Sequence, residues 1–173
     1  MKRTINFYIK NELLIKDEIV KRLANEYLTK AKNNLITLKI LDEFQNDKIF
    51  RKKYNVPENY STYEWVVITA YYAMYTAAIS LLAKIGYRSK NHTATLCVLE
   101  EFFVKKKFLE QDTLTSLKSA MFHKEEVEKL SDARHKREIA QYSITKQTTK
   151  SIAEKIKRDA YDFVNKCEEI IKQ

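Results

Sequence analysis

The chain has 173 residues, of which 32 % are charged, and it contains one glycine and one proline. This length fits one domain with a single sizeable core, and so few turn-forming residues disfavour a protein built from β-hairpins. The formal net charge of +9 favours acidic partners such as RNA, nucleotides or an acidic protein, although a lysine-rich soluble surface explains it equally well. Because Lys10 and Glu12 interrupt the N-terminal stretch before any long apolar segment forms, we expect no secretory signal and a cytoplasmic protein.

The N-terminal part divides into an extension and a first helix. Residues 1–16 show no clear apolar period, and we treat them as an extension to a helical domain that spans residues 17–173. A helix is predicted from about residue 17 to residue 44, because alanines and leucines recur there at steps of three and four: Ala24, Leu28, Ala31, Leu35 and Leu38.

Residues 45–60 lose this period and contain the single proline, Pro57. We expect the longest loop of the protein here, with a short helical turn at about residues 49–53.

The stretch from Ser61 to Gly86 is predicted to be the central helix of a bundle. Ser61 and Glu64 have the spacing of a capping box, and Gly86 suits the left-handed residue that closes a helix. Apolar residues follow two lines along it: Trp65, Ile68, Tyr72, Tyr75, Ile79 and Leu82 on one, and Tyr71, Met74, Ala78, Leu81 and Ile85 on the other. Residues 65–83 carry no charge and come close to the length of a membrane span. However, the amphipathic helices around this segment need an apolar partner, so we expect a buried core helix and no membrane segment.

Three further helices follow, at about residues 92–107, 112–140 and 145–173. Each is preceded or begun by a residue that can cap a helix: Asn91, Asp112 and Thr145. The last helix has a regular apolar stripe: Ile152, Ile156, Ala160, Phe163, Cys167 and Ile170. We therefore predict an all-α fold, an up-and-down bundle of about five helices.

The apolar line of the fourth helix continues at the same spacing onto Arg134, Arg137 and Gln141. A guanidinium group is costly to bury without a partner, so an arginine that extends an apolar stripe is expected to meet an anion at the edge of the bundle. That anion is either a carboxylate of a neighbouring helix or a phosphate, which the forked donors of arginine bind at two points.

Three segments together resemble the HEPN superfamily, and more narrowly its small stand-alone prokaryotic members: AYYAMYTAAISLLAKIGYRSKNH, EEFFVKKKFL and REIAQY. The resemblance implies an up-and-down helical bundle and a homodimer. It also implies a possible small nucleotidyltransferase partner in a toxin–antitoxin pair, and it connects the chain with metal-independent endoribonucleases. His92 matches the histidine of the family's connector after the central helix, and it joins Arg134, Arg137, Tyr142 and Tyr72 in the nucleotide- or RNA-binding set that we predict.

The departure from the nuclease members concerns a histidine. In those members an arginine is followed after four to six residues by a histidine that assists proton transfer at the ribose 2′-hydroxyl. The position five beyond Arg137 is Tyr142, and no histidine follows His135. Because a phenol with a pKa near ~10 is a poor base at neutral pH, we expect a module that binds a nucleotide, RNA or a protein partner and has no catalytic activity. The alternative is an endoribonuclease with an altered Arg…Tyr site.

No cofactor or metal is expected, because Cys97 and Cys167 have no histidine or second cysteine at metal-ligand spacing and no glycine-rich phosphate loop occurs. Self-association is expected for a different reason. Several aromatic residues lie off the inner stripes of the predicted helices, and residual apolar surface of this kind marks interfaces. These residues are Tyr27, Phe44, Phe103 and Phe108.

Overall fold

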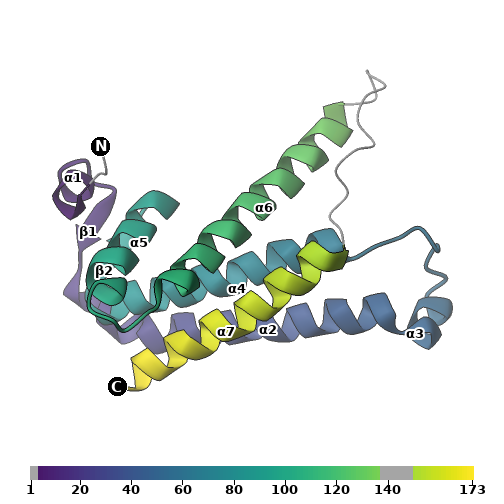
Figure 1. The fold of residues 1–173 in the computed structure, drawn as a ribbon, viewed down its shortest axis with the longest axis horizontal. Coiled ribbons are helices and arrows are strands. Elements are labelled where there is room, and N and C mark those ends of the chain that lie inside the picture. The colour runs from purple at the N-terminus through teal and green to yellow at the C-terminus, as the bar shows by residue number, and fades with distance from the viewer. Residues whose placement is uncertain (1–3, 137–149) are drawn as a thin grey trace.

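The computed structural model of the protein describes residues 4–136 and 150–173, and the side chains of residues 4–129 and 150–173. Helices form the body of the molecule and correspond to the five predicted ones (Figure 1). They are α2 (Ala24–Asn46), α4 (Tyr63–Lys84), α5 (His92–Leu99) with a π-helical continuation over Glu100–Val104, α6 (Gln111–Lys136) and α7 (Lys150–Lys172). The prediction of an all-α bundle is confirmed.

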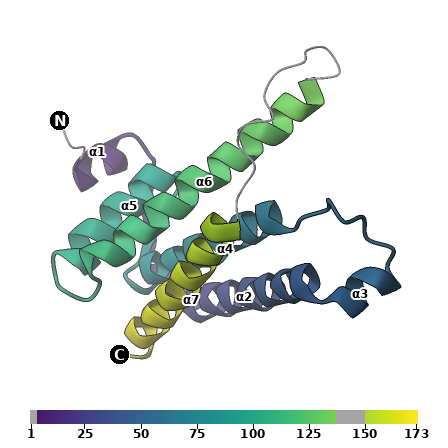
Figure 2. The same cartoon turned by 45° about the vertical axis from the view of Figure 1, so that its right-hand side comes forward.

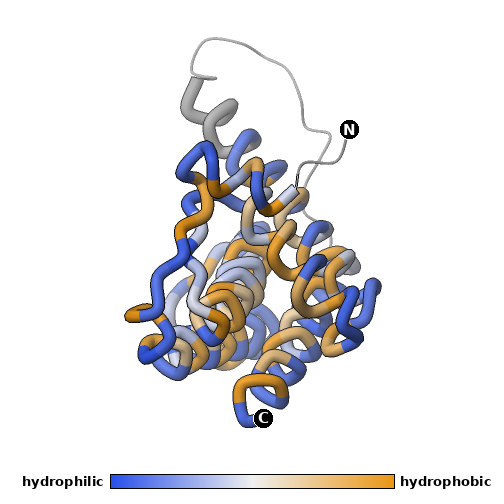
Figure 3. Tube along the Cα trace, turned by 90° about the vertical axis from the view of Figure 1, so that its left-hand side faces the viewer, coloured by the Kyte–Doolittle hydropathy of each residue, from blue (hydrophilic) through white to orange (hydrophobic). Residues whose placement is uncertain are grey.

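Helix α4 lies at the centre and packs most extensively on α2 and α7. Helix α6 starts against this group and runs away from it toward its C-terminal end (Figures 1 and 2). Hydrophobic and hydrophilic residues alternate along most of the chain trace, as expected for amphipathic helices around a shared core (Figure 3). The largest fully buried side chains include Leu38, Tyr71, Met74, Ile156 and Phe163.

The two apolar lines of α4 differ in burial. Tyr71, Met74 and Leu81 on one line are at most 1 % exposed, whereas Trp65 and Tyr72 on the other are 54 % and 44 % exposed. The expectation that the core helix is buried along both apolar lines is therefore wrong for Trp65 and Tyr72, which lie in the N-terminal half of α4. By length and composition α4 could cross a membrane, but 67 % of its most apolar window is buried inside the protein. It is the core helix of the bundle.

The N-terminal residues form structure that the sequence pattern did not predict. A short helix, α1 (Ile5–Lys10), leads into strand β1 (Leu14–Lys16), and a 3-10 helix, η1 (Glu18–Leu23), precedes α2. Strand β1 pairs antiparallel with β2 (Tyr87–Ser89), which follows α4. Side chains from this part of the chain also belong to the main core cluster, so the domain boundary at residue 17 stays a prediction.

Helix ends agree with the sequence in part. The predicted capping box is wrong in its first residue: α4 begins at Tyr63, its N-cap is Thr62, and the Thr62 hydroxyl donates to the carbonyl of Leu41. Helix α6 begins at Gln111, so Asp112 lies inside the helix. The short turn expected in the long loop is α3 (Lys48–Lys53).

Gly86 closes α4 as predicted and has a φ of +74°. A Cβ at this position would lie 2.8 Å from Glu18 Oε1, the end of a flexible side chain that can move, so the positive φ is what makes a larger residue unfavourable here. The turn at Gly86 brings the chain directly into β2 and then into α5.

Candidate functional site

His92 is the first residue of α5 and directly follows the β2 connector. Asn91 fixes this position, because its backbone is extended and its side-chain Oδ1 accepts a hydrogen bond from the Ala94 amide at 2.8 Å. The predicted cap at Asn91 is confirmed. The imidazole of His92 is thereby held against Tyr71 and Tyr75 of α4.

Two tyrosines of α4, one helical turn apart, enclose the imidazole. The Tyr71 hydroxyl lies 2.9 Å from His92 Nδ1, and the Tyr75 ring lies with its centroid 4.6 Å from that of His92. Tyr71 is 1 % exposed, so its hydroxyl is satisfied inside the protein by the histidine. With Tyr71 as the donor, Nδ1 is the unprotonated ring nitrogen and Nε2 carries the proton.

Lys124 of α6 covers the tyrosines from the other side. Its Nζ lies 5.6 Å from the ring centroid of Tyr71 and 5.8 Å from that of Tyr72, both within the range of cation–π attraction. The Lys124 side chain is only 14 % exposed, and its ammonium pairs with the carboxylate of Glu128 one turn further along α6. A positive charge is therefore held close to an aromatic surface and a histidine.

The electrostatics keep the two hydrogen-bonded groups neutral at physiological pH. Burial, and after it the charge of Lys124, lowers the pKa of His92 below its ordinary value of 6.5, while Glu125 and Glu128 oppose this shift. Burial raises the pKa of Tyr71 well above its ordinary value. With Nδ1 bonded to Tyr71, the neutral imidazole has its Nε2–H to donate to a ligand, and the nearby Lys124 ammonium favours a negatively charged ligand.

The structure brings two of the predicted site residues into one neighbourhood. The Tyr72 ring is 5.2 Å from that of Tyr71, which contacts His92, and Tyr72 is 44 % exposed. Arg134 lies in α6 ten residues beyond Lys124, about 15 Å along the helix axis at the usual rise per residue. The side chain of Arg134, as well as Arg137 and Tyr142 as a whole, lies outside the described residues.

Sequence reasoning missed Tyr71, Tyr75 and Lys124 as parts of this site. Helical spacing indicates only that Tyr71 and Tyr75 are core residues of α4. The sequence does contain a signal for Lys124, because it continues the line of Leu117 and Met121 at helical spacing. A lysine in an apolar stripe is as unusual as Arg134 and Arg137 at the end of one. Among the residues that the structure describes, no group of three or more His, Cys, Asp or Glu side chains could hold a metal ion.

Comparison with known proteins agrees with this architecture. The family model of the HEPN domain matches residues 50–170. The chain is also 33 % identical over 109 residues to a UPF0332 protein of the archaeon Archaeoglobus fulgidus, an alignment that covers 63 % of this chain and 76 % of the relative. The matched range contains α4, the β2 connector with His92, and α6 with Lys124. With its helical bundle, the histidine after the central helix and a family match over most of its length, the chain belongs to the HEPN domain family.

Proposed function

We propose that the protein is a nucleotide- or RNA-binding HEPN module whose binding surface contains Tyr72, His92 and Lys124. Family membership supports a nucleotide- or RNA-related module in general. The observation that carries the proposal is the placement of the Lys124 ammonium over the exposed ring of Tyr72. A ring open to solvent offers a base a stacking surface, and an adjacent cation attracts the phosphate next to that base.

Arg134, Arg137 and Tyr142 complete this surface in the proposal. They follow Lys124 along the chain, and arginine forks hold phosphate oxygens at two points. The module binds without cleaving, because Tyr142 occupies the position where nuclease members have a histidine and His92 is engaged with Tyr71. A metal-independent endoribonuclease with an altered Arg…Tyr site is the competing function, and the assay below separates the two.

The proposed setting is a cytoplasmic homodimer that pairs with a small nucleotidyltransferase in a toxin–antitoxin system. Trp65 supports self-association, because its large ring on α4 is 54 % exposed. Phe108 and Phe103, two of the aromatic residues from which a dimer is expected, differ in exposure. Phe108 is 46 % exposed and can take part in a contact, whereas Phe103 is 3 % exposed and belongs to the core.

The test combines binding and cleavage on the full chain. Fluorescence anisotropy with labelled single-stranded RNA should give saturable, salt-sensitive binding that Lys124→Gln and Arg137→Gln each weaken about tenfold, as expected for one lost charge-assisted contact. Lys118→Gln is the matched control, since it removes the same charge from an exposed position on the same helix. Light scattering of the same samples reports the oligomeric state.

Equal affinity in the wild type, both site variants and the control would overturn the proposed surface. Incubation with tRNA and mixed single-stranded RNA without metal should leave the RNA intact. Cleavage that disappears in Arg137→Ala would instead establish the altered nuclease.

A further inference from the structure

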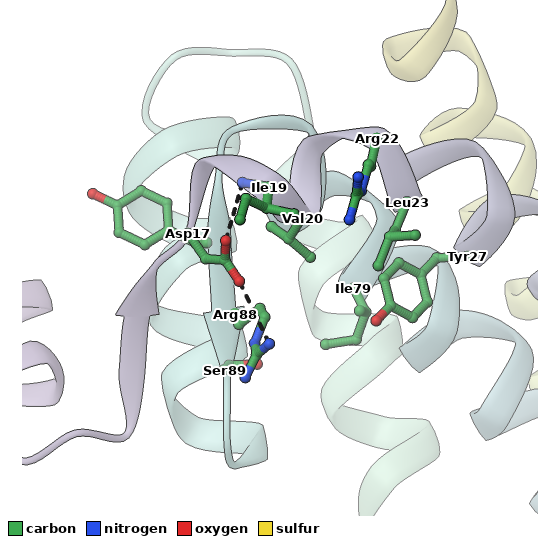
Figure 4. A pocket seen from close by; sticks show the side chains of 10 residues that line it. Asp17, Ile19, Val20, Arg22, Leu23, Tyr27, Ile79, Arg88 and Ser89 are labelled. Atoms are coloured by element: carbon green, nitrogen blue, oxygen red, sulfur yellow. Dashed lines mark hydrogen bonds and ion pairs between the residues drawn. The ribbon is translucent and has the colours of Figure 1, made fainter.

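A second concave site lies on a different part of the molecule, between η1, the start of α2, α4 and β2 (Figure 4). The cavity has a volume of about 370 Å³ and shares none of its lining residues with the Tyr72–Lys124 surface. Its size is near the lower end of the range of small-molecule sites, which suits one small ligand.

Part of the lining of this pocket is apolar. Val20 and Leu23 from the N-terminal side and Ile79 from α4 line it, and the ring of Tyr27 forms one side. Figure 4 shows the Tyr27 hydroxyl turned toward Ile79, so that a polar tip stands at the edge of the apolar surface. A ligand with a flat or apolar body could bury that body here.

Two arginines come into the pocket from opposite sides. Figure 4 shows Arg22, from η1, and Arg88, from β2, on opposite sides of the pocket that both line, with the Arg88 guanidinium beside Asp17 and Ser89. The carboxylate of Asp17 lies 3.4 Å from Arg88, and among the described residues no carboxylate lies within ion-pair distance of Arg22. Two positive charges and one negative charge leave the lining with a net charge of +1.

The polar groups of the pocket are held in place by the backbone. The Asp17 amide donates to the Gly86 carbonyl at 2.8 Å, and the Asp17 side chain accepts from the Ile19 amide at 3.0 Å. On the opposite strand, the Ser89 hydroxyl is 2.6 Å from that of Thr95. Because strand pairing and a capped turn hold the backbone around Asp17 and Arg88, an anion can bind here without a rearrangement of that backbone.

We propose that this pocket binds one small organic phosphate, with the phosphate between Arg22 and Arg88 and a flat ring against Tyr27 and Ile79. A phosphate presents three acceptor oxygens, which suits two guanidinium forks on opposite sides better than the two oxygens of a carboxylate. A nucleotide has this chemistry, either free or as the 5′-phosphorylated end of an RNA. The site goes beyond the proposed function, since it uses none of the residues assigned there.

Isothermal titration of the full chain with AMP, adenosine and ribose 5-phosphate tests the two halves of the ligand. AMP should bind with a saturable isotherm, and loss of either the ring or the phosphate should weaken binding by about tenfold or more. A short RNA with and without a 5′-phosphate distinguishes a chain end from a free nucleotide. Absence of saturable binding for AMP and for the 5′-phosphorylated RNA would overturn the proposal.

Three variants locate the binding. Arg22→Gln should weaken AMP binding about tenfold, whereas Arg158→Gln, the same change at an exposed position of α7, should not. Asp17→Asn keeps the capping oxygen but removes the competing charge, so it should tighten binding, a gain that misfolding cannot imitate. AMP binding that falls only in Lys124→Gln, and is unchanged in Arg22→Gln and Asp17→Asn, would place the ligand at the first surface and refute this one.

Discussion

Two regions of the protein gather aromatic rings, and they hold them in opposite ways. At the site end, Tyr71 is 1 % exposed and its hydroxyl is satisfied by His92. At the far end of α2, around α3, Phe50, Tyr54 and Tyr60 are 39–56 % exposed and contact one another or neighbouring rings at the surface. The same residue types therefore serve the core in one region and leave apolar surface in water in the other.

The α3 region is ordered by hydrogen bonds more than by burial. No residue of α3 is buried, yet Arg51 donates to the carbonyls of Pro57 and Tyr60 at 2.9 and 3.0 Å, and Asp47 caps the helix. Around Tyr71, in contrast, order comes with the removal of apolar surface from water, which contributes far more free energy for each side chain. Replacing an aromatic ring by alanine in each region, and measuring the free energy of unfolding, should separate the contribution of burial from that of hydrogen bonding.

The largest effect is expected for Tyr71→Ala, which should lower the free energy of unfolding by about 3–5 kcal/mol, as other buried ring truncations do. Tyr71→Phe keeps the ring and loses the bond to His92, so it should cost only about 1 kcal/mol. Urea denaturation followed by circular dichroism measures both. Equal costs for the two variants would show that the hydrogen bond, and not the burial of the ring, dominates this region.

A smaller effect is expected from the titration of His92. Its folded-state pKa lies below the ordinary 6.5, so the unfolded chain binds more protons in this range and stability should be lost as the pH falls below about 6.5. His92→Gln should remove part of that slope. Unfolding curves at several pH values between 5 and 8 measure it, and a slope that survives in His92→Gln would contradict the assignment.

The smallest effect is expected at α3. Phe50→Ala should change stability by at most about 1 kcal/mol, because the ring is 39 % exposed and belongs to a helix without buried residues. The same denaturation experiment applies. A loss as large as that of Tyr71→Ala would show that the exposed rings support the fold, and the contrast between the two regions would fail.

The helices could be predicted from the sequence because their signal is periodic. The spacing indicated which residues of α2 and α7 are buried. In α7 these include Ile156, Ala160 and Phe163. The two strands could not be predicted, since each has three residues and its partner lies about 75 residues away in the chain. Three residues are too few to show alternation, and no local pattern encodes such a distant pairing.

The site was predictable only in part. His92 and Tyr72 were identified and do lie in one neighbourhood, but their selection depended on a family resemblance more than on spacing. The Tyr71–His92 bond could not be predicted, because it depends on how the turn at Gly86 returns the chain onto α4. The face of α4 that stays open also depends on where α6 departs from the bundle, which a helical period does not encode.

The pairing of β1 with β2 has a consequence for the order in which the protein is made. Leu14 pairs with Ser89, so the first strand leaves the ribosome long before its partner and stays unpaired while α2 and α4 are synthesised. Closing a loop of that length costs conformational entropy, and the packing of α2 against α4 reduces this cost by bringing the ends of the loop together. Arg88, which lies in this ladder, and His92, which follows it at the start of α5, thus take their final positions only once both strands exist.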